Sequence, residues 1–225
     1  MQPIFFLHIT KTAGGSLKEI VRHSPADVRL HYPGEPGYSR EFEYDRMHEV
    51  YFGHFFYGAH AKVGAEPRYA AFLREPVSRT VSHYHHLVNH DSGKVGDMVR
   101  SYPDLKTFLE SRRRWEFDNF MCRVIAGTAN QPKVGQLGPE IYEQAVENLR
   151  RHFVFIGLFE DLEGSLARLN EIIPLRHGKL PHVNKGRYKD QLDAETQELL
   201  DDANRYDRLL YQEALNLLRR TSGAA

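Results

Sequence analysis

Short apolar runs alternate with amphipathic stretches along most of the chain, and this alternation predicts a sheet of buried strands covered by helices. The first apolar run is almost continuous, which is typical of a strand buried on both faces of a parallel sheet. The predicted strands are residues 3–9, 28–32, 50–56, 69–73 and 153–159. Gly53 and His54 interrupt the third of them.

Apolar residues at helical spacing fill the segments between these strands. The predicted helices are residues 16–23, 77–89, 104–110, 117–126, 139–151, 162–173 and 194–219. Because strands alternate with helices from the start, the pattern predicts an α/β fold, a three-layer sandwich with a mainly parallel central sheet. Helices dominate residues 104–151, which we expect to form a wall on the substrate side of the sheet. We predict one domain over residues 1–225, with a disordered tail at 221–225.

The composition is ordinary for a globular protein, with 41% hydrophobic and 27% charged residues. Lys and Arg number 30, as do Asp and Glu, so no global field favours nucleic acid or an anionic membrane, and an anion site must be local. A single cysteine, Cys122, excludes an intrachain disulfide and a cysteine metal cluster. The first apolar run lacks a basic leader and is too short to cross a bilayer. We therefore expect a cytoplasmic protein without a membrane span.

The segment between the first predicted strand and helix has the chemistry of a phosphate-binding loop. It reads His8-Ile9-Thr10-Lys11-Thr12-Ala13-Gly14-Gly15-Ser16-Leu17. Two glycines let the backbone approach an anion, and the helix N-terminus directs free N–H groups at it. Lys11 adds a mobile charge, while Thr12 and Ser16 add hydroxyl donors. The lysine precedes the glycines, so this is not a Walker A motif, and a glycine turn with a solvated lysine stays an alternative.

A second junction between a strand and a helix repeats this chemistry. It reads Ala71-Phe72-Leu73-Arg74-Glu75-Pro76-Val77-Ser78-Arg79-Thr80-Val81-Ser82. Arg74 ends the strand and can grip a phosphate through two parallel N–H bonds, while Pro76 suits the first turn of a helix. Ser82 follows two turns later. For this junction alone, the alternative is an Arg74 paired with a carboxylate and a Ser82 that only fills space.

Together, the two junctions resemble the paired signatures with which sulfotransferases bind 3′-phosphoadenosine-5′-phosphosulfate (PAPS), those of the carbohydrate 2-O-sulfotransferase type above all. The first resembles the 5′-phosphosulfate loop and the second the 3′-phosphate element. Residues 51–54 are similar to that family's Gly-His segment, residues 148–162 to its late strand and helix, and residues 182–185 to its basic loop. The resemblance implies a P-loop-kinase-like sulfotransferase fold, PAPS as the cofactor and no required metal.

The resemblance also implies roles for single residues. Those implied to bind the cofactor are Lys11, Thr12, Ala13, Gly14, Gly15, Ser16, Leu17, Arg74, Ser82, Asn184, Lys185 and Gly186. Lys11 is expected to stabilise charge on the departing phosphate, and His54 to take the proton of the acceptor hydroxyl. A hydrogen-bonded histidine at a strand end is the alternative for His54. Phe52 and Thr10 depart from the family, which often has a second histidine and a proline there.

Candidates for contact with the acceptor come from residues 112–123. Arg114 offers charge to an anionic sugar and Trp115 offers a ring face for stacking, although a solvated basic face is the alternative. Asn119 and Arg123 are further candidates to line the acceptor cleft.

Three histidines, His83, His86 and His90, share one face of a predicted helix and raise the question of a metal site. No HExxH pattern or nearby cysteine supports one, so we interpret them as packing residues. The apolar stripe of the last predicted helix is either core or the face of a homo-oligomer.

We therefore predict a PAPS-dependent O-sulfotransferase that moves a sulfuryl group by in-line displacement to a hydroxyl group, on a saccharide or a glycolipid precursor. One alternative is a nucleotide-dependent small-molecule kinase on a related scaffold, although the sequence offers neither a Walker A motif nor an obvious carboxylate for magnesium. The other is a nucleotide-binding homologue that has lost the transfer chemistry.

Overall fold

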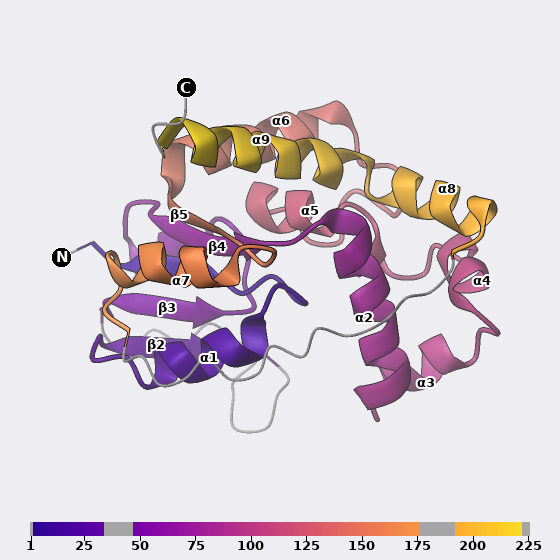
Figure 1. Cartoon of the computed structure of the whole chain (residues 1–225), viewed down its shortest axis with the longest axis horizontal. Coiled ribbons are helices and arrows are strands. Elements are labelled where there is room, and N and C mark those ends of the chain that lie inside the picture. Colours follow the sequence, from indigo (N-terminus) through magenta and orange to yellow (C-terminus); the bar gives the residue numbers. More distant parts are fainter. Residues whose placement is uncertain (1, 34–46, 176–191, 222–225) are drawn as a thin grey trace.

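The computed structural model describes residues 2–33, 47–175 and 192–221, and in this part of the chain a parallel sheet lies between two layers of helices (Figure 1). The strands are β1 (Ile4–Leu7), β2 (Val28–His31), β3 (Val50–Gly53), β4 (Tyr69–Leu73) and β5 (Phe153–Leu158). Their order is β2-β3-β1-β4-β5, and every neighbouring pair is parallel. The predicted three-layer α/β fold with a parallel sheet is thereby confirmed.

The two faces of the sheet follow directly from the alternation of side chains along each strand. On one face Phe5, Leu7 and Tyr51 join a cluster covered by α5 (Phe120–Ala126), α6 (Pro139–His152) and α9 (Arg205–Thr221). On the other face Phe6 and Phe52 join a cluster covered by α1 (Gly14–Arg22) and α7 (Leu162–Asn170). Both faces are buried, which explains why the first apolar run is continuous instead of alternating.

A third cluster extends beyond the carboxyl ends of the strands. There α2 (Pro76–His90), α3 (Lys94–Arg100), α4 (Leu105–Glu110) and α8 (Ala194–Ala203) pack around Val81, Phe108 and Leu200. Figure 1 shows these helices on the side of the sheet toward which the strand arrows point. Helices dominate the segment 104–151 as predicted, although residues 127–138 between α5 and α6 are not helical. Its place on the acceptor's side stays a prediction.

Several predicted boundaries differ from the observed ones. The predicted helix 194–219 is two helices, because the buried side chain of Asn204 accepts a hydrogen bond from Thr80 Oγ1 (2.8 Å) between them. The predicted helix 117–126 is a 3₁₀ turn, η2 (Trp115–Phe117), followed by α5, because Asn119 adopts a left-handed conformation with φ 48°. Helix α3 was not predicted, and residues 59–63 form a further 3₁₀ turn, η1 (Ala59–Val63).

Some predictions fall on residues outside the described ranges. Asn184, Lys185 and Gly186 lie there, as does the tail apart from Thr221, which ends α9. That residues 1–225 form one domain stays a prediction. None of the helices in the described ranges combines the length and the apolar character needed to cross a membrane.

Candidate active site

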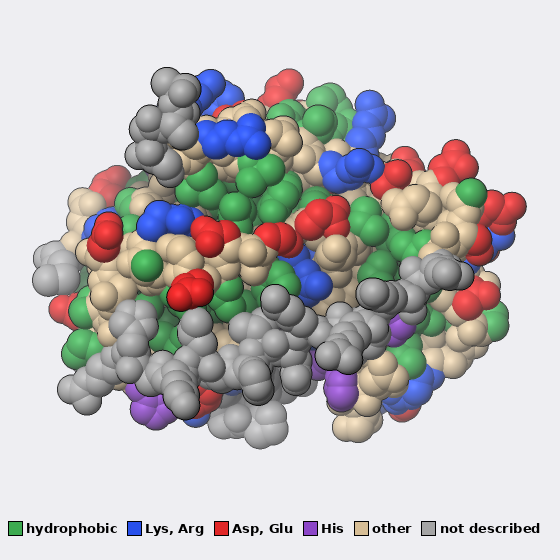
Figure 2. Space-filling view, in the orientation of Figure 1, with side chains coloured by type: hydrophobic (Ala, Val, Ile, Leu, Met, Phe, Trp, Pro, Cys, Tyr) green, Lys and Arg blue, Asp and Glu red, His purple; other side chains and the backbone are tan. Residues whose placement is uncertain are grey.

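The register of the sheet brings the candidate residues to one edge. Leu7 at the end of β1 lies opposite Gly53 of β3 and Ala71 of β4. The residues that follow these strand ends, among them Lys11, His54 and Arg74, therefore leave the sheet at its carboxyl edge, where parallel α/β sheets bind ligands. In the view of Figure 2, basic side chains reach the surface between α7 and α2, beside this edge.

The loop between β1 and α1 is tightly folded. Lys11 and Ala13 both have positive φ, 69° and 73°, although neither is a glycine. Conformations of this kind cost about 1–3 kcal/mol each and concentrate at ligand-binding sites. Thr12 is buried, and its hydroxyl donates to the Ile9 carbonyl at 2.7 Å. The hydroxyl proton of Thr12 is bound within the loop in this structure, and its contact with an anion stays a prediction.

The two glycines of the loop have different surroundings. A Cβ at Gly14 would lie 1.2 Å from Nε2 of His8, so only glycine fits beneath that imidazole. A Cβ at Gly15 would have no atom within 4 Å. Helix α1 starts with no side chain capping its first N–H groups, so the space above Gly15 adjoins donors that are free to bind an anion.

Lys11 of this loop lies close to Arg74, which follows β4. Nη1 of Arg74 donates to the Lys11 carbonyl at 3.2 Å, and its guanidinium stacks over the Phe159 ring at 4.2 Å. Burial lowers the pKa of Lys11, and the charge of Arg74 lowers it further. Burial also lowers the pKa of Arg74, although Glu160 and Glu75 oppose that change. Two positive charges that lie this close repel each other, and a bound anion would relieve the repulsion. The pair therefore favours the binding of an anion.

Helix α2 begins beside Arg74 as predicted. Pro76 is its first residue, and the Glu75 carboxylate accepts hydrogen bonds from the N–H groups of Val77 (3.1 Å) and Ser78 (2.7 Å). Ser82 lies farther along this helix and is half-buried. Its contact with a phosphate stays a prediction.

His54 is joined to the loop through a tilted contact with the His8 ring. Its ring centroid is 4.6 Å from that of His8 and 4.8 Å from that of Tyr32. His8 in turn touches Gly14 and pairs with the Tyr32 hydroxyl at 2.9 Å. Burial, and secondarily the neighbouring His54, hold the pKa of His8 well below its usual range. His8 thus stays neutral and separates the His54 ring from Gly14.

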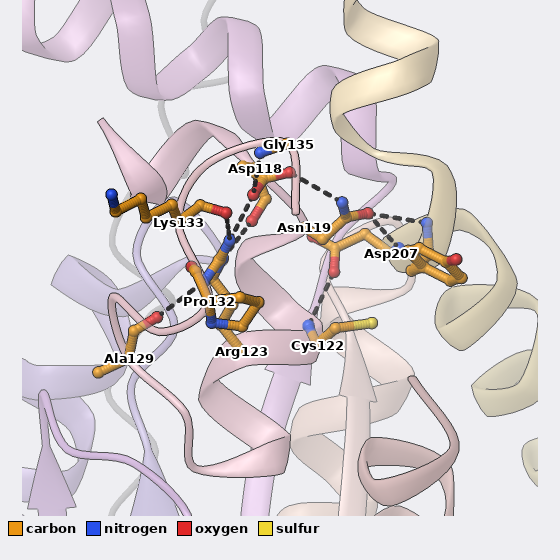
Figure 3. A network of polar contacts seen from close by, with 10 residues as sticks. Asp118, Asn119, Cys122, Arg123, Ala129, Pro132, Lys133, Gly135 and Asp207 are labelled. Carbon is orange, nitrogen blue, oxygen red and sulfur yellow. Dashed lines mark hydrogen bonds and ion pairs between the residues drawn. The ribbon is translucent and has the colours of Figure 1, made fainter. Parts of the chain in front are cut away.

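Asn119 and Arg123 do not line a cleft, so their predicted contact with an acceptor is wrong (Figure 3). The Arg123 side chain has no exposed surface: it pairs with Asp118 and donates to the carbonyls of Pro132 (2.7 Å) and Ala129 (3.2 Å). Asn119 is 4% exposed and accepts from the N–H groups of Tyr206 and Asp207. The polar groups of both side chains are therefore occupied by hydrogen bonds that hold the surrounding backbone in place.

Arg114 and Trp115 remain partly accessible. Arg114 pairs with Glu116, which is the carboxylate partner expected of a structural arginine. The Trp115 ring lies between Phe56, with centroids 5.8 Å apart, and Phe120, at 5.6 Å. Stacking of a sugar on Trp115 stays a prediction.

Two residues to which the sequence analysis gave no role belong to this region. His8 is half-buried and joins Gly14 to His54. Arg79 has no exposed surface, donates to the Glu116 carbonyl at 2.8 Å and so ties α2 to η2. Burial lowers the pKa of Arg79 to about 10, partly offset by Asp207. Its place on the helix that follows Arg74, five residues farther along the chain, was the signal available in the sequence.

The sulfotransferase family model matches residues 2–213, which is nearly the whole chain. The chain belongs to the sulfotransferase family. The resemblance seen in its two loops is thereby confirmed. Among the described residues of this family member, no three His, Cys, Asp or Glu side chains gather closely enough to hold a metal ion.

Curated relatives are similar over part of their length. Heparan sulfate 2-O-sulfotransferase 1 of Gallus gallus is 29% identical over 167 residues, which cover 65% of this chain and 46% of the relative. The Homo sapiens protein of that name is 29% identical over 156 residues, 60% of this chain and 42% of the relative. The chain thus matches less than half the length of these relatives. Among solved structures, mouse sulfotransferase SULT7A1 complexed with PAP superposes with a TM-score of 0.44 at 13% identity, covering 90% of this chain and 63% of that one.

Proposed function

We propose that this family member is a PAPS-dependent O-sulfotransferase. The observation that carries the proposal is the contact between Lys11 and Arg74, two partly buried cations beside a glycine loop at the carboxyl edge of the sheet. The alternative considered for Arg74 alone is an ion pair with a carboxylate. An ion pair does not explain why the Arg74 guanidinium donates a hydrogen bond to the Lys11 carbonyl. An anion that bears two phosphate groups would satisfy both cations.

The described residues fit the anionic groups of PAPS. Nε of Arg74 is buried and has no hydrogen-bond partner among the described residues. The space above Gly15 is open, and α1 presents its first N–H groups there. We assign the 5′-phosphosulfate to Lys11 and the N–H groups of residues 13–16, because the N–H group of Leu17 already donates to the Ala13 carbonyl at 3.1 Å. We assign the 3′-phosphate to Arg74 and Ser82. Charge-assisted bonds of this kind contribute about 1.5–3 kcal/mol each.

When bound, PAPS supplies the sulfuryl group: its sulfur forms a bond to the acceptor oxygen as the bond to the 5′-phosphate oxygen breaks, and the acceptor loses a proton. Lys11 stabilises the negative charge that grows on the phosphate side. His54 takes the acceptor proton, and its contact with the neutral His8 orients its ring.

We place the acceptor hydroxyl on a saccharide or a glycoconjugate. The support comes from the relatives, which are named for the 2-O-sulfation of heparan sulfate. The cytoplasmic location and a possible homo-oligomer stay predictions from the sequence.

The test is transfer itself. The purified chain is incubated with PAPS and a panel of saccharides, and the products are analysed by mass spectrometry for the mass added by one sulfate. We expect one or more saccharides to gain sulfate, and Lys11→Ala to abolish the gain. Binding of the nucleotide without transfer to any member of the panel would favour the alternative of a non-catalytic homologue.

A further inference from the structure

A cavity of about 350 Å³ lies next to His54, apart from the loops assigned to the nucleotide. Its lining residues are His31, His54, Phe55, Phe56, Tyr57, Gly58, Ala59 and Lys62. Most of them follow β3 directly, in a segment from which the sequence singled out only His54. A cavity of this size is at the lower end of the range for small-molecule sites.

The aromatic walls of this cavity are held in place from behind. Phe55 packs edge-on against Phe5 of the core, with ring centroids 6.4 Å apart. The hydroxyl of Tyr57 pairs with Nδ1 of His152 at 2.6 Å. Phe56 leans on the Trp115 ring. Because each ring is fixed by contacts outside the cavity, an occupant meets prearranged apolar faces and need not order them on binding.

Among the described lining residues, Lys62 is the one lysine or arginine. Lys62 lies on η1, which is bounded by Gly58 and Gly64, both with positive φ (99° and 65°). Lys62 is exposed, and no ion pair joins it to any residue that the structure describes. None of the described lining residues is acidic. Besides the imidazoles of His31 and His54, the described lining therefore offers ring faces and one permanently charged group, the Lys62 ammonium.

We propose that this cavity binds the acceptor, and that Lys62 selects ring-shaped acceptors that carry one negative group, a carboxylate or a phosphate. The inference rests on the proposed function, because His54 joins the cavity to the nucleotide loop through His8. It moves the acceptor from residues 119 and 123, which are buried, to residues 54–62. Trp115 does not line this cavity, but its ring packs against Phe56 from outside and so supports one wall.

The test uses three probes with the same sugar ring: methyl β-glucoside, methyl β-glucuronide and glucose 6-phosphate. Each is titrated into the protein saturated with the product nucleotide PAP, and binding is followed by ligand-observed NMR. We expect the glucuronide, the phosphate or both to bind about two- to fivefold more tightly than the neutral glucoside, as is typical of an exposed ion pair. That preference should shrink as salt is added.

Three variants locate the effect. Lys62→Ala should remove the preference for charged probes, whereas Lys94→Ala, an exposed lysine on α3 outside the lining, should keep it. Phe56→Leu should weaken all three probes by a similar factor, because the stacking face is lost while the charge remains. Equal binding of neutral and charged probes, a preference that survives in Lys62→Ala, or no binding of any probe would overturn the proposal. Failure of PAP to bind the unmodified protein would instead contradict the proposed function.

Discussion

Asn119 and Asp207 lie 88 residues apart, and each accepts hydrogen bonds from the first N–H groups of the other's helix (Figure 3). Oδ1 of Asn119 accepts from the N–H groups of Tyr206 (2.7 Å) and Asp207 (3.2 Å) at the start of α9. The Asp207 carboxylate accepts from Met121 (2.9 Å) and Cys122 (2.7 Å) at the start of α5. These hydrogen bonds hold α5 and α9 together on the same face of the sheet. The first N–H groups of each helix are capped by a side chain from the start of the other.

Removing the Asp207 carboxylate should therefore destabilise the fold. Asp207→Ala leaves two buried N–H groups without acceptors and deprives the buried Arg79 of its neighbouring negative charge. We expect the free energy of unfolding in urea to fall by roughly 3–5 kcal/mol. The control is Asp201→Ala on α8, whose carboxylate forms a partly exposed pair with Arg208 and should cost less than about 1 kcal/mol. Equal losses of unfolding free energy in the two variants would show that capping by Asp207 stabilises the fold no more than a partly exposed ion pair does.

The two loop glycines should respond differently to alanine. Gly14→Ala forces a methyl group into His8, so we expect a loss of stability of about 1–3 kcal/mol. Gly15→Ala meets no atom and should fold normally, but its methyl group would occupy the space assigned to the phosphosulfate. Urea unfolding measures the first effect and calorimetric titration with PAP the second. Normal PAP affinity in Gly15→Ala would place the anion elsewhere.

His83 should make the protein sensitive to acid. Burial, followed by the charges of Arg79 and His86, holds its pKa well below the usual 6.5. Between the two values the unfolded chain binds more protons than the folded one, so stability falls as the pH drops below about 6.5, by at most about 1.4 kcal/mol per unit. In His83→Leu this slope should be shallower between pH 7 and 5, as measured by urea unfolding at each pH. His23→Leu, which alters an exposed histidine at the end of α1, is the control, and a slope equally steep in all three proteins contradicts the assignment.

His54 should matter for turnover and not for the nucleotide. If it takes the acceptor proton, His54→Ala should lower kcat by about 10²–10⁴-fold while PAP affinity is retained. His60→Ala is the matched control, because His60 follows the same strand but pairs with the Tyr69 hydroxyl at 2.7 Å. Normal turnover in His54→Ala would leave His54 with only a structural role.

The parts of the site that could be predicted from the sequence are those formed by neighbours in the chain. A strand, a glycine loop and a helix start are specified within ten residues, so the loop of Lys11 and the junction at Arg74 and Pro76 were recognisable. Burial on both faces likewise made the strands visible as apolar runs. The register of parallel strands then brought the two loops together.

The errors concern residues whose partners lie outside their own helix. Polar residues on a helix look like lining for a cleft, but Asn119 and Arg123 are consumed by Asp207, Asp118 and backbone carbonyls. Asn204 divides the last predicted helix through its bond to Thr80, which no local pattern reveals. The cavity after β3 did leave a signal, because three aromatic residues in a row precede Gly58. In the sequence this aromatic run is indistinguishable from a continuation of the apolar strand predicted over residues 50–56.

The most direct test of the proposed function is calorimetric titration of the protein with PAP, 5′-AMP and ATP-Mg, on the unmodified chain and on Arg74→Ala. We predict that PAP binds much more tightly than 5′-AMP or ATP-Mg, and that Arg74→Ala removes most of this advantage while leaving the weak binding of 5′-AMP. A preference for ATP-Mg, or PAP affinity that does not depend on Arg74, would contradict the assignment of these two loops to PAPS.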